Sequence, residues 1–191
     1  SNIPALPQGS SHDLVRAGAG RWHACPMTTP TIALRPATRA DIPLILDLVH
    51  ALAEYEREPD AVEATEDLLE EQLFGEHPGA EVIIAEVDGQ GAGFALFFHN
   101  FSTWRGRRGL YLEDLFVRPQ FRGLGLGRAL MIHLAKLAVQ RGCGRFEWSV
   151  LDWNTPAIDF YRSLGAVGMD EWTVQRLDGE GLLALAAKAD A

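Results

Sequence analysis

A glycine-rich loop, Arg122-Gly123-Leu124-Gly125-Leu126-Gly127, joins a predicted strand to a predicted helix. Its three glycines stand at every second position, so their backbone N–H groups can converge on one anion. The N-terminus of the following helix adds partial positive charge at the same place, which favours a phosphate group. The spacing is neither the dinucleotide-binding G-x-G-x-x-G nor an ATP-binding loop ending in Gly-Lys-Ser/Thr. A purely structural glycine-rich turn is the alternative that these residues alone leave open.

The apolar periodicity on either side of this loop predicts both strands and helices. Strands are expected at residues 31–35, 81–87, 91–98, 110–117, 146–151 and 171–177. Helices are expected from the capping pattern Thr38-x-x-Asp41 to Tyr55, at 65–74, from the glycine loop to Gly142, at 154–164 and at 181–187. This order indicates a single α/β domain with a mixed, mostly antiparallel sheet flanked by helices.

Length and composition limit the possible functions. With 191 residues and 47% hydrophobic content, the chain can build one sizeable core, assigned here to residues 31–191. Residues 1–30 mix Gly, Ser and Pro without periodicity and are expected to form a flexible leader or tag-derived segment. The net charge of −9 disfavours nucleic acid as the main partner and suits a small cationic or neutral substrate.

The two cysteines, Cys25 and Cys143, lie far apart and lack the spacing of a zinc site or a disulfide framework. We therefore expect no metal site and a reducing, cytoplasmic environment. No apolar run approaches the ~20 residues of a membrane span, so no membrane association is expected.

Three segments together carry a family resemblance. Arg122-x-x-Gly125-x-Gly127 resembles the signature with which GNAT acetyltransferases bind the diphosphate of coenzyme A. The segments 111–117 (Tyr-Leu-Glu-Asp-Leu-Phe-Val) and 152–166, which begins Asp-Trp-Asn-Thr-Pro-Ala, resemble the spermidine/spermine (diamine) N-acetyltransferases of that superfamily. The resemblance covers residues 31–187. It implies acetyl-CoA as cosubstrate and a central pair of strands that splay apart.

The resemblance also assigns residues to the cofactor. The end of the strand at 115–117 would bind the pantetheine arm, the glycine loop would hold the diphosphate, and Asn154 would contact the arm. A plain helix cap is the alternative for Asn154, and both roles can coexist. The cofactor-binding residues expected on this basis are Leu115, Phe116, Val117, Arg122, Gly123, Leu124, Gly125, Leu126, Gly127, Arg128, Asn154, Pro156 and Ala157.

Acetyl transfer to an amine requires an ammonium to lose a proton and a departing thiolate to gain one. By resemblance, Tyr161 is expected to protonate the thiolate, and Glu113 to take the proton of the amine through water. Asp114 would point to the opposite face of the strand by alternation. Without the resemblance, Tyr161 reads as a core aromatic residue, and the acidic pair reads as a solvated strand edge.

The acceptor pocket is expected to have an acidic and aromatic rim, which suits an ammonium group. The substrate-binding residues implied by the resemblance are Tyr55, Glu56, Trp104, Asp114 and Trp172. The segments 102–107 and 150–154 look more like the branch that acetylates thialysine and related amines. Arg105, Arg107 and Arg108 would place positive charge near the pocket, which is compatible with an amino-acid carboxylate. Diamines, polyamines and lysine-like amino acids all stay open as acceptors.

The chain is therefore predicted to be an N-acetyltransferase that transfers acetyl directly in a ternary complex, since nothing marks Cys143 as a nucleophile. A non-catalytic acyl-CoA sensor is one alternative, which the joint presence of Tyr161 and Glu113 disfavours. A protein lysine or N-terminal acetyltransferase is another, which the sequence does not separate. The family resemblance also implies a homodimer, in which the strand expected at 171–177 could add across the interface.

Overall fold

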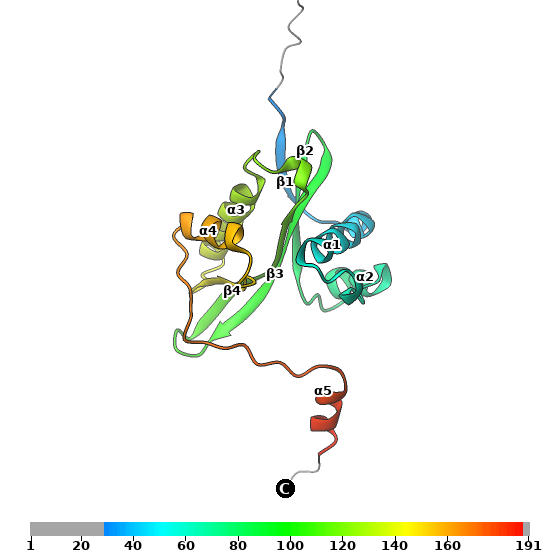
Figure 1. Ribbon diagram of the computed structural model, residues 1–191, viewed down its shortest axis with the longest axis vertical. Helices are drawn as coiled ribbons and strands as arrows, with labels where there is room; N and C mark the ends of the chain where they lie inside the picture. Colours follow the sequence, from blue (N-terminus) through cyan, green and yellow to red (C-terminus); the bar gives the residue numbers. More distant parts are fainter. Residues whose placement is uncertain (1–28, 189–191) are drawn as a thin grey trace, which may run out of the picture.

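The computed structural model describes residues 29–188, which form a five-stranded sheet with helices on both faces (Figure 1). The strands are β1 (Ile32–Pro36), β2 (Glu81–Val87), β3 (Gln90–Ser102), β4 (Arg107–Val117) and β5 (Phe146–Trp148). They lie in the order β1-β2-β3-β4-β5, and all neighbours are antiparallel except β4 and β5, which are parallel. The predicted single α/β domain with a mixed, mostly antiparallel sheet is confirmed.

Four of the five α-helices cover the two faces of this sheet, and the last one in the chain lies apart from it (Figure 1). The α-helices are α1 (Ile42–Glu56), α2 (Glu66–Phe74), α3 (Leu126–Gln140), α4 (Thr155–Ser163) and α5 (Gly179–Ala186). Short 3-10 helices occur at Arg39–Asp41, Pro59–Ala61 and Pro119–Phe121. In Figure 1, α1 and α2 cover one face and α3 and α4 the other. Accordingly Phe94 and Phe116 pack under α1, whereas Phe97, Leu110 and Leu112 pack under α3.

The corner between β1 and α1 is fixed by a buried carboxylate. Asp41 is only 8% exposed and accepts two hydrogen bonds of 2.8 Å from the guanidinium of Arg35. It also accepts from the backbone N–H (2.8 Å) and the hydroxyl (2.9 Å) of Thr38, as the predicted capping pattern requires. The Arg35 hydrogen bonds and those of Thr38 hold the pKa of Asp41 well below its usual range, although burial opposes them. Arg35 also pairs with Glu86 on β2, which ties the corner to the sheet.

Strand β4 is interrupted by a β-bulge at Glu113. Its neighbours pair with β3 as Leu112 with Phe97 and Asp114 with Leu96, which leaves Glu113 without a partner. On the other side, β5 pairs with β4 only up to Leu112, opposite Trp148. Beyond that point β4 and β5 diverge, so the expected splay begins at the bulge.

Two of the predicted strands, at 146–151 and 171–177, differ from the structure. The strand predicted at 146–151 ends at Trp148, because the chain turns there and the N–H of Asn154 bonds to the carbonyl of Leu151. The strand predicted at 171–177 is wrong: this segment is exposed and pairs with no described strand. Figure 1 shows it running from the body of the domain to α5. Alternating residues do not form a strand unless a neighbouring edge lies beside them.

The sequence-based expectations about membrane spans, metal sites and cysteines can be compared with the described residues. Among residues 29–188, no helix is both long and apolar enough to span a bilayer. In the same range, no group of three or more potential ligand side chains could hold a metal ion. Cys143 is free and half-buried, and Cys25 lies outside the described residues, as does the predicted leader except for its last two residues. The cytoplasmic location stays a prediction.

Candidate active site

The glycine loop adopts a conformation that requires glycine at two positions. Gly123 and Gly125 have φ angles of 82° and 86°, in the left-handed region that side chains disfavour. A β-carbon at either position would meet no atom within 4 Å, so the loop lies against open space. Gly125 is the N-cap of α3, whose first turn therefore faces that space without side-chain cover. Open N–H groups at a helix N-terminus fit the diphosphate expected there.

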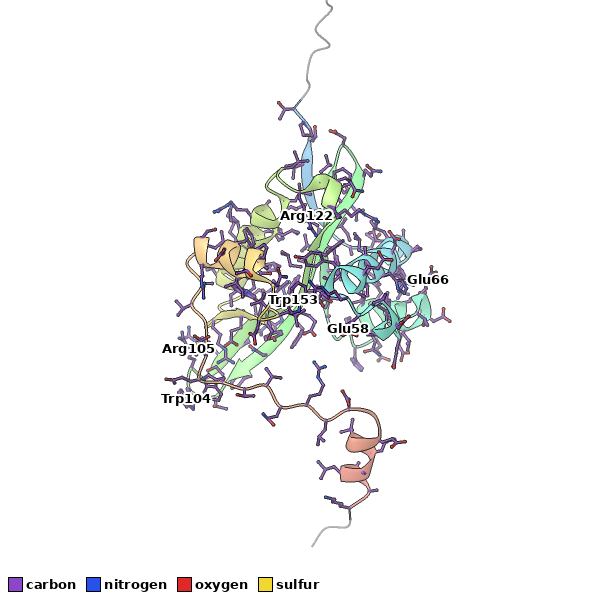
Figure 2. The ribbon with its side chains drawn as sticks, in the orientation of Figure 1. Glu58, Glu66, Trp104, Arg105, Arg122 and Trp153 are labelled. Atoms are coloured by element: carbon purple, nitrogen blue, oxygen red, sulfur yellow. The ribbon has the colours of Figure 1, made fainter. Side chains whose placement is uncertain are left out.

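Two arginines flank the loop. The Arg122 Nε donates to the carbonyl of Val117 at 3.1 Å, and the guanidinium lies 4.8 Å from the ring centroid of Tyr55. Arg122 thereby lies between the end of β4 and the end of α1, at the centre of the molecule in Figure 2. Arg128, on α3, reaches the hydroxyl of Ser163 on α4 at 3.3 Å. Both side chains are exposed, and both could reach an anion at the loop.

The end of β4 offers its backbone rather than its side chains. Leu115 and Val117 pack in the core under α3, whereas Phe116 is buried in the core under α1. Because β5 has already diverged, no strand of the described part of the chain pairs with the edge of β4 from Glu113 to Val117 on that side. An amide-containing arm such as pantetheine can pair with such an edge. The residues present therefore fit coenzyme A at both its diphosphate and its arm.

Asn154 links α4 to α1. It is 7% exposed, and its Oδ1 accepts from the backbone N–H of Ala157 at 3.3 Å, so the helix-cap interpretation is confirmed. The same oxygen accepts from the hydroxyl of Tyr55 at 3.2 Å. Pro156 lies in the first turn of α4, where its missing N–H costs nothing. The contact of Asn154, Pro156 and Ala157 with a cofactor stays a prediction.

Tyr161, on α4, lies within an aromatic cluster. Its ring centroid is 5.0 Å from that of Trp148 and 5.3 Å from that of Phe160. Burial raises the pKa of Tyr161 to about 12, and the nearby charges of Glu56 and Tyr55 add to the effect. The phenol therefore keeps its proton at any physiological pH, so a proton donor is available at this place.

Three carboxylates surround the bulge. Glu113 is exposed, whereas Asp114 is half-buried. Burial, followed by the charges of Glu113 and Glu56, raises the pKa of Asp114 to about 6. Burial also raises the pKa of Glu56 at the end of α1. Since Glu56 acts on both Asp114 and Tyr161, the ends of α1, β4 and α4 bring these groups together, and an ammonium would relieve their mutual repulsion.

Two of the predicted pocket residues do not join this group. Trp104 lies in the turn between β3 and β4 and is 91% exposed, at the end of the molecule far from Arg122 and Trp153 in Figure 2. Trp172 is 70% exposed in the extended segment before α5. Arg105 lies beside Trp104 and donates to the carbonyl of Gly144 at 2.7 Å, so the charge expected near the pocket belongs to the hairpin end.

Two residues that the sequence analysis does not single out lie beside the candidate site. The ring of Trp153 lies 6.3 Å from that of Tyr55, and the guanidinium of Arg57 lies 4.6 Å from the Trp153 ring centroid. Arg57 and Trp153 directly follow and precede the predicted residues Glu56 and Asn154. Adjacency was therefore an available signal, although nothing in the sequence indicates that the two side chains meet.

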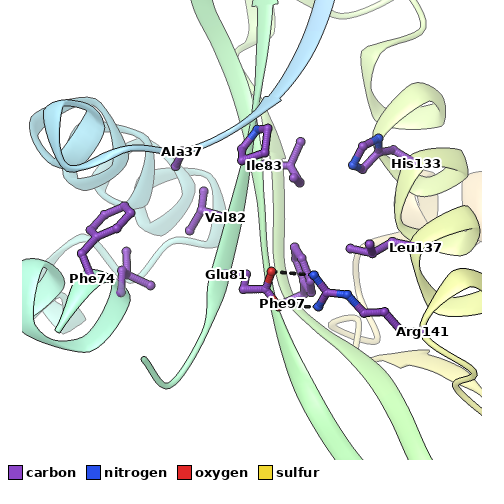
Figure 3. A pocket seen from close by; sticks show the side chains of 11 residues that line it. Ala37, Phe74, Glu81, Val82, Ile83, Phe97, His133, Leu137 and Arg141 are labelled. Carbon is purple, nitrogen blue, oxygen red and sulfur yellow. Dashed lines mark hydrogen bonds and ion pairs between the residues drawn. The ribbon is translucent and has the colours of Figure 1, made fainter. Parts of the chain in front are cut away.

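A separate cavity of about 210 Å³ lies between α2 and α3 at the edge of β2 (Figure 3). Its lining is mostly apolar, with Ile83, Phe97 and Leu137 among its residues. Arg141 forms an ion pair with Glu81 at its border, as the dashed lines in Figure 3 mark. None of the residues predicted for cofactor, acceptor or catalysis lines this cavity.

Comparison with known proteins identifies relatives of the whole domain. Residues 45–166 match the model of the acetyltransferase (GNAT) family. A thialysine N-epsilon-acetyltransferase of Sus scrofa is 37% identical over 169 residues, covering 83% of this chain and 99% of the relative. An L-ornithine N5-acetyltransferase of Arabidopsis thaliana is 32% identical, covering 84% and 92%. The solved structure of an integron cassette protein from V. cholerae superposes with a TM-score of 0.70 at 31% identity, covering 82% and 98%.

Proposed function

Because the chain belongs to the acetyltransferase (GNAT) family, we propose that it transfers acetyl from acetyl-CoA to the primary amine of a small cationic acceptor. It is an N-acetyltransferase, and the proposal concerns its donor, its acceptor and its catalytic groups. The observation that carries the proposal is the divergence of β4 from β5 beside the glycine loop, with Tyr161 and the three carboxylates at the same place.

The donor would be held by the loop of residues 122–128 and by the free edge of β4. When bound, acetyl-CoA supplies a thioester carbon that an amine nitrogen can attack. Arg122 and Arg128 would neutralise the diphosphate, while the N–H groups at the start of α3 donate hydrogen bonds to it. Asn154, with Pro156 and Ala157, would fix the α4 side of the arm.

Two proton movements complete the reaction. Tyr161 would donate its phenolic proton to the sulfur as the carbon–sulfur bond breaks, and Glu113 would take the proton of the attacking amine through water. Asp114 and Glu56 would attract the ammonium of the acceptor, since their repulsion falls when a cation binds between them. Tyr55 would present its aromatic face to the same group.

Thialysine and ornithine, the acceptors in the names of the two relatives, are amino acids with a primary amine at the end of the side chain. We propose an acceptor of this kind. The acidic cluster suits its terminal ammonium, and the overall charge of −9 favours the approach of cations.

We also propose that the chain works as a homodimer. Beyond α4, apolar side chains are exposed along residues 167–185, a pattern that a separate monomer rarely shows. These residues are Val167, Met169, Trp172, Val174, Leu177, Leu182, Leu183 and Leu185. A second copy could supply the missing neighbour for 171–177. Light scattering of the full chain and of a chain ending at residue 166 tests this, and a monomeric full chain contradicts it.

The activity is tested by coenzyme A thiol release from acetyl-CoA with ornithine, thialysine, lysine, spermidine, putrescine or a histone-tail peptide as acceptor. Tyr161→Phe should lower kcat by about 10²–10⁴-fold and leave the affinity for acetyl-CoA nearly unchanged. Tyr111→Phe is the matched control, because among residues 29–188 the Tyr111 hydroxyl bonds to Ser149 alone, at 2.8 Å.

Two outcomes would overturn the proposal. Tight acetyl-CoA binding without turnover on any amine would favour an acyl-CoA sensor. Turnover confined to the peptide would favour a protein acetyltransferase.

A further inference from the structure

Arg57 occupies an unusual position at the end of α1. It is the C-cap of that helix, with a φ of 69°, and its backbone N–H bonds to the carbonyl of Glu54 at 3.2 Å. Only two residues other than glycine have positive φ among the described residues, and left-handed caps are usually glycine. The turn carries the Arg57 side chain toward the loop before α4, where its guanidinium lies 4.6 Å from the Trp153 ring centroid.

The guanidinium of Arg57 is held by an aromatic ring rather than by a carboxylate. Within residues 29–188, it has no acidic partner within 4.0 Å, in contrast to Arg35 at the β1–α1 corner. The guanidinium lies over the Trp153 ring, and its N–H groups donate no hydrogen bond to any of residues 29–188. Such a planar fork matches a carboxylate with two parallel hydrogen bonds.

The residue before Arg57, Glu56, gives the site a negative pole beside the positive pole of Arg57. Glu56 directly follows Tyr55, whose hydroxyl donates to Asn154 at the start of α4 at 3.2 Å. The charge of Glu56 raises the pKa of both Asp114 and Tyr161. The end of α1 therefore presents an acidic group and, one residue later, a cation directed at Trp153. A molecule with an ammonium at one end and a carboxylate at the other matches both poles. A diamine matches only the first and would bring its second ammonium near Arg57.

We infer that Arg57 binds the α-carboxylate of an amino-acid acceptor and thereby selects amino acids over diamines. This specificity rests on the proposed acetylation of a small amine. Of the other arginines described above, Arg128 contacts α4 beside the glycine loop and Arg105 lies at the end of the β3–β4 hairpin, whereas Arg122 donates to Val117 and lies over Tyr55. Trp153 is the positioning residue for Arg57.

The test compares acceptors that differ only in the carboxylate: ornithine with putrescine, and lysine with cadaverine. Arg57→Ala should lower kcat/KM for ornithine by about 10- to 100-fold, mainly through KM, and leave putrescine unchanged or improved. Arg57→Lys should lie between the parent and Arg57→Ala for ornithine, because it keeps the charge without the fork. Trp153→Leu should shift selectivity in the same direction.

Lys136→Ala is the control, since it removes one exposed positive charge from α3 without touching the site. An equal loss on ornithine and putrescine in Arg57→Ala would assign Arg57 a structural role and overturn the inference, as would no change on either. If the parent acetylates no amine at all, the proposed function fails instead. Calorimetric binding of ornithine and putrescine to the parent and to Arg57→Ala then tests carboxylate recognition without turnover.

Discussion

Asp41 and Asp114 are both at least partly buried, but the residues around them shift their pKa values in opposite directions. Asp41 has four hydrogen-bond donors from Arg35 and Thr38, which hold its pKa well below the usual range. Asp114 faces the carboxylates of Glu113 and Glu56, and its pKa rises to about 6. The first aspartate fixes the β1–α1 corner, whereas the second has further carboxylates around it instead of donors. Uncompensated charge therefore distinguishes the site from the scaffold.

The largest effect is expected at the corner. Asp41→Ala should lower the free energy of unfolding by about 3 kcal/mol, because it leaves the Arg35 guanidinium and the Thr38 N–H without their main acceptor. Urea unfolding measures this. Asp159→Ala is the control, since its pair with Arg162 spans 3.8 Å on the surface and should matter little. Equal effects of the two substitutions would show that the corner does not anchor the fold.

At the candidate site, by contrast, a substitution is expected to increase the free energy of unfolding, and the increase should depend on pH. Since the folded pKa of Asp114 is raised, its stabilising contribution is complete below the unfolded value of 3.8 and is lost as pH rises through about 6. Asp114→Asn should therefore leave stability near that of the parent at pH 4 and exceed it by about 1–3 kcal/mol at pH 7.5. Its acetylation rate at pH 7.5 should fall.

Urea midpoints at pH 4, 6 and 7.5 follow this trend, and Asp159→Asn is the control because Asp159 is exposed and lies outside the candidate site. A stability gain that is independent of pH would mean that the benefit comes from packing rather than from the charge. A loss of stability at pH 7.5 would mean that an unrecognised partner compensates Asp114.

The smallest effect on stability is expected at the cavity between α2 and α3. Arg141 and Glu81 form an ion pair there whose Nη2 to Oε2 distance is 2.7 Å, and it lowers the pKa of the half-exposed Glu81. Glu81→Gln should cost about 0.2–1 kcal/mol, and the difference should vanish in 1 M salt because exposed pairs are screened. A salt-independent loss would place this pair with the corner rather than with the surface.

Local patterns in the sequence were sufficient for much of the fold. The capping pattern at Thr38 and Asp41, the glycine loop, and the apolar face of α3 each depend on residues within one element, and each predicts that element correctly. The strand at 171–177 failed because pairing depends on an edge elsewhere in the molecule. Its alternating residues specify a face but not a neighbour.

The site was predictable only where residue identity carries the chemistry. Resemblance placed Tyr161, Glu56 and Asp114 among the candidates, and the structure brings these three together. The resemblance also assigns Trp104 and Trp172 to the acceptor pocket, but both are exposed and lie away from these three residues. The position of the Arg57 side chain is not predictable from the sequence, because it depends on a left-handed helix cap, and arginine is not a residue that indicates such a cap.

The bulge in β4 also separates folding from chemistry. Leu112 before the bulge and Leu115 after it face the same core, so Glu113 is a supernumerary residue that shifts the phase of the strand by one step. Without it, Leu112, Asp114 and Leu115 would continue a regular in-out-in alternation, and both cores would keep their members. Deletion of Glu113 should thus leave a folded protein that retains the glycine loop and lacks the base proposed above.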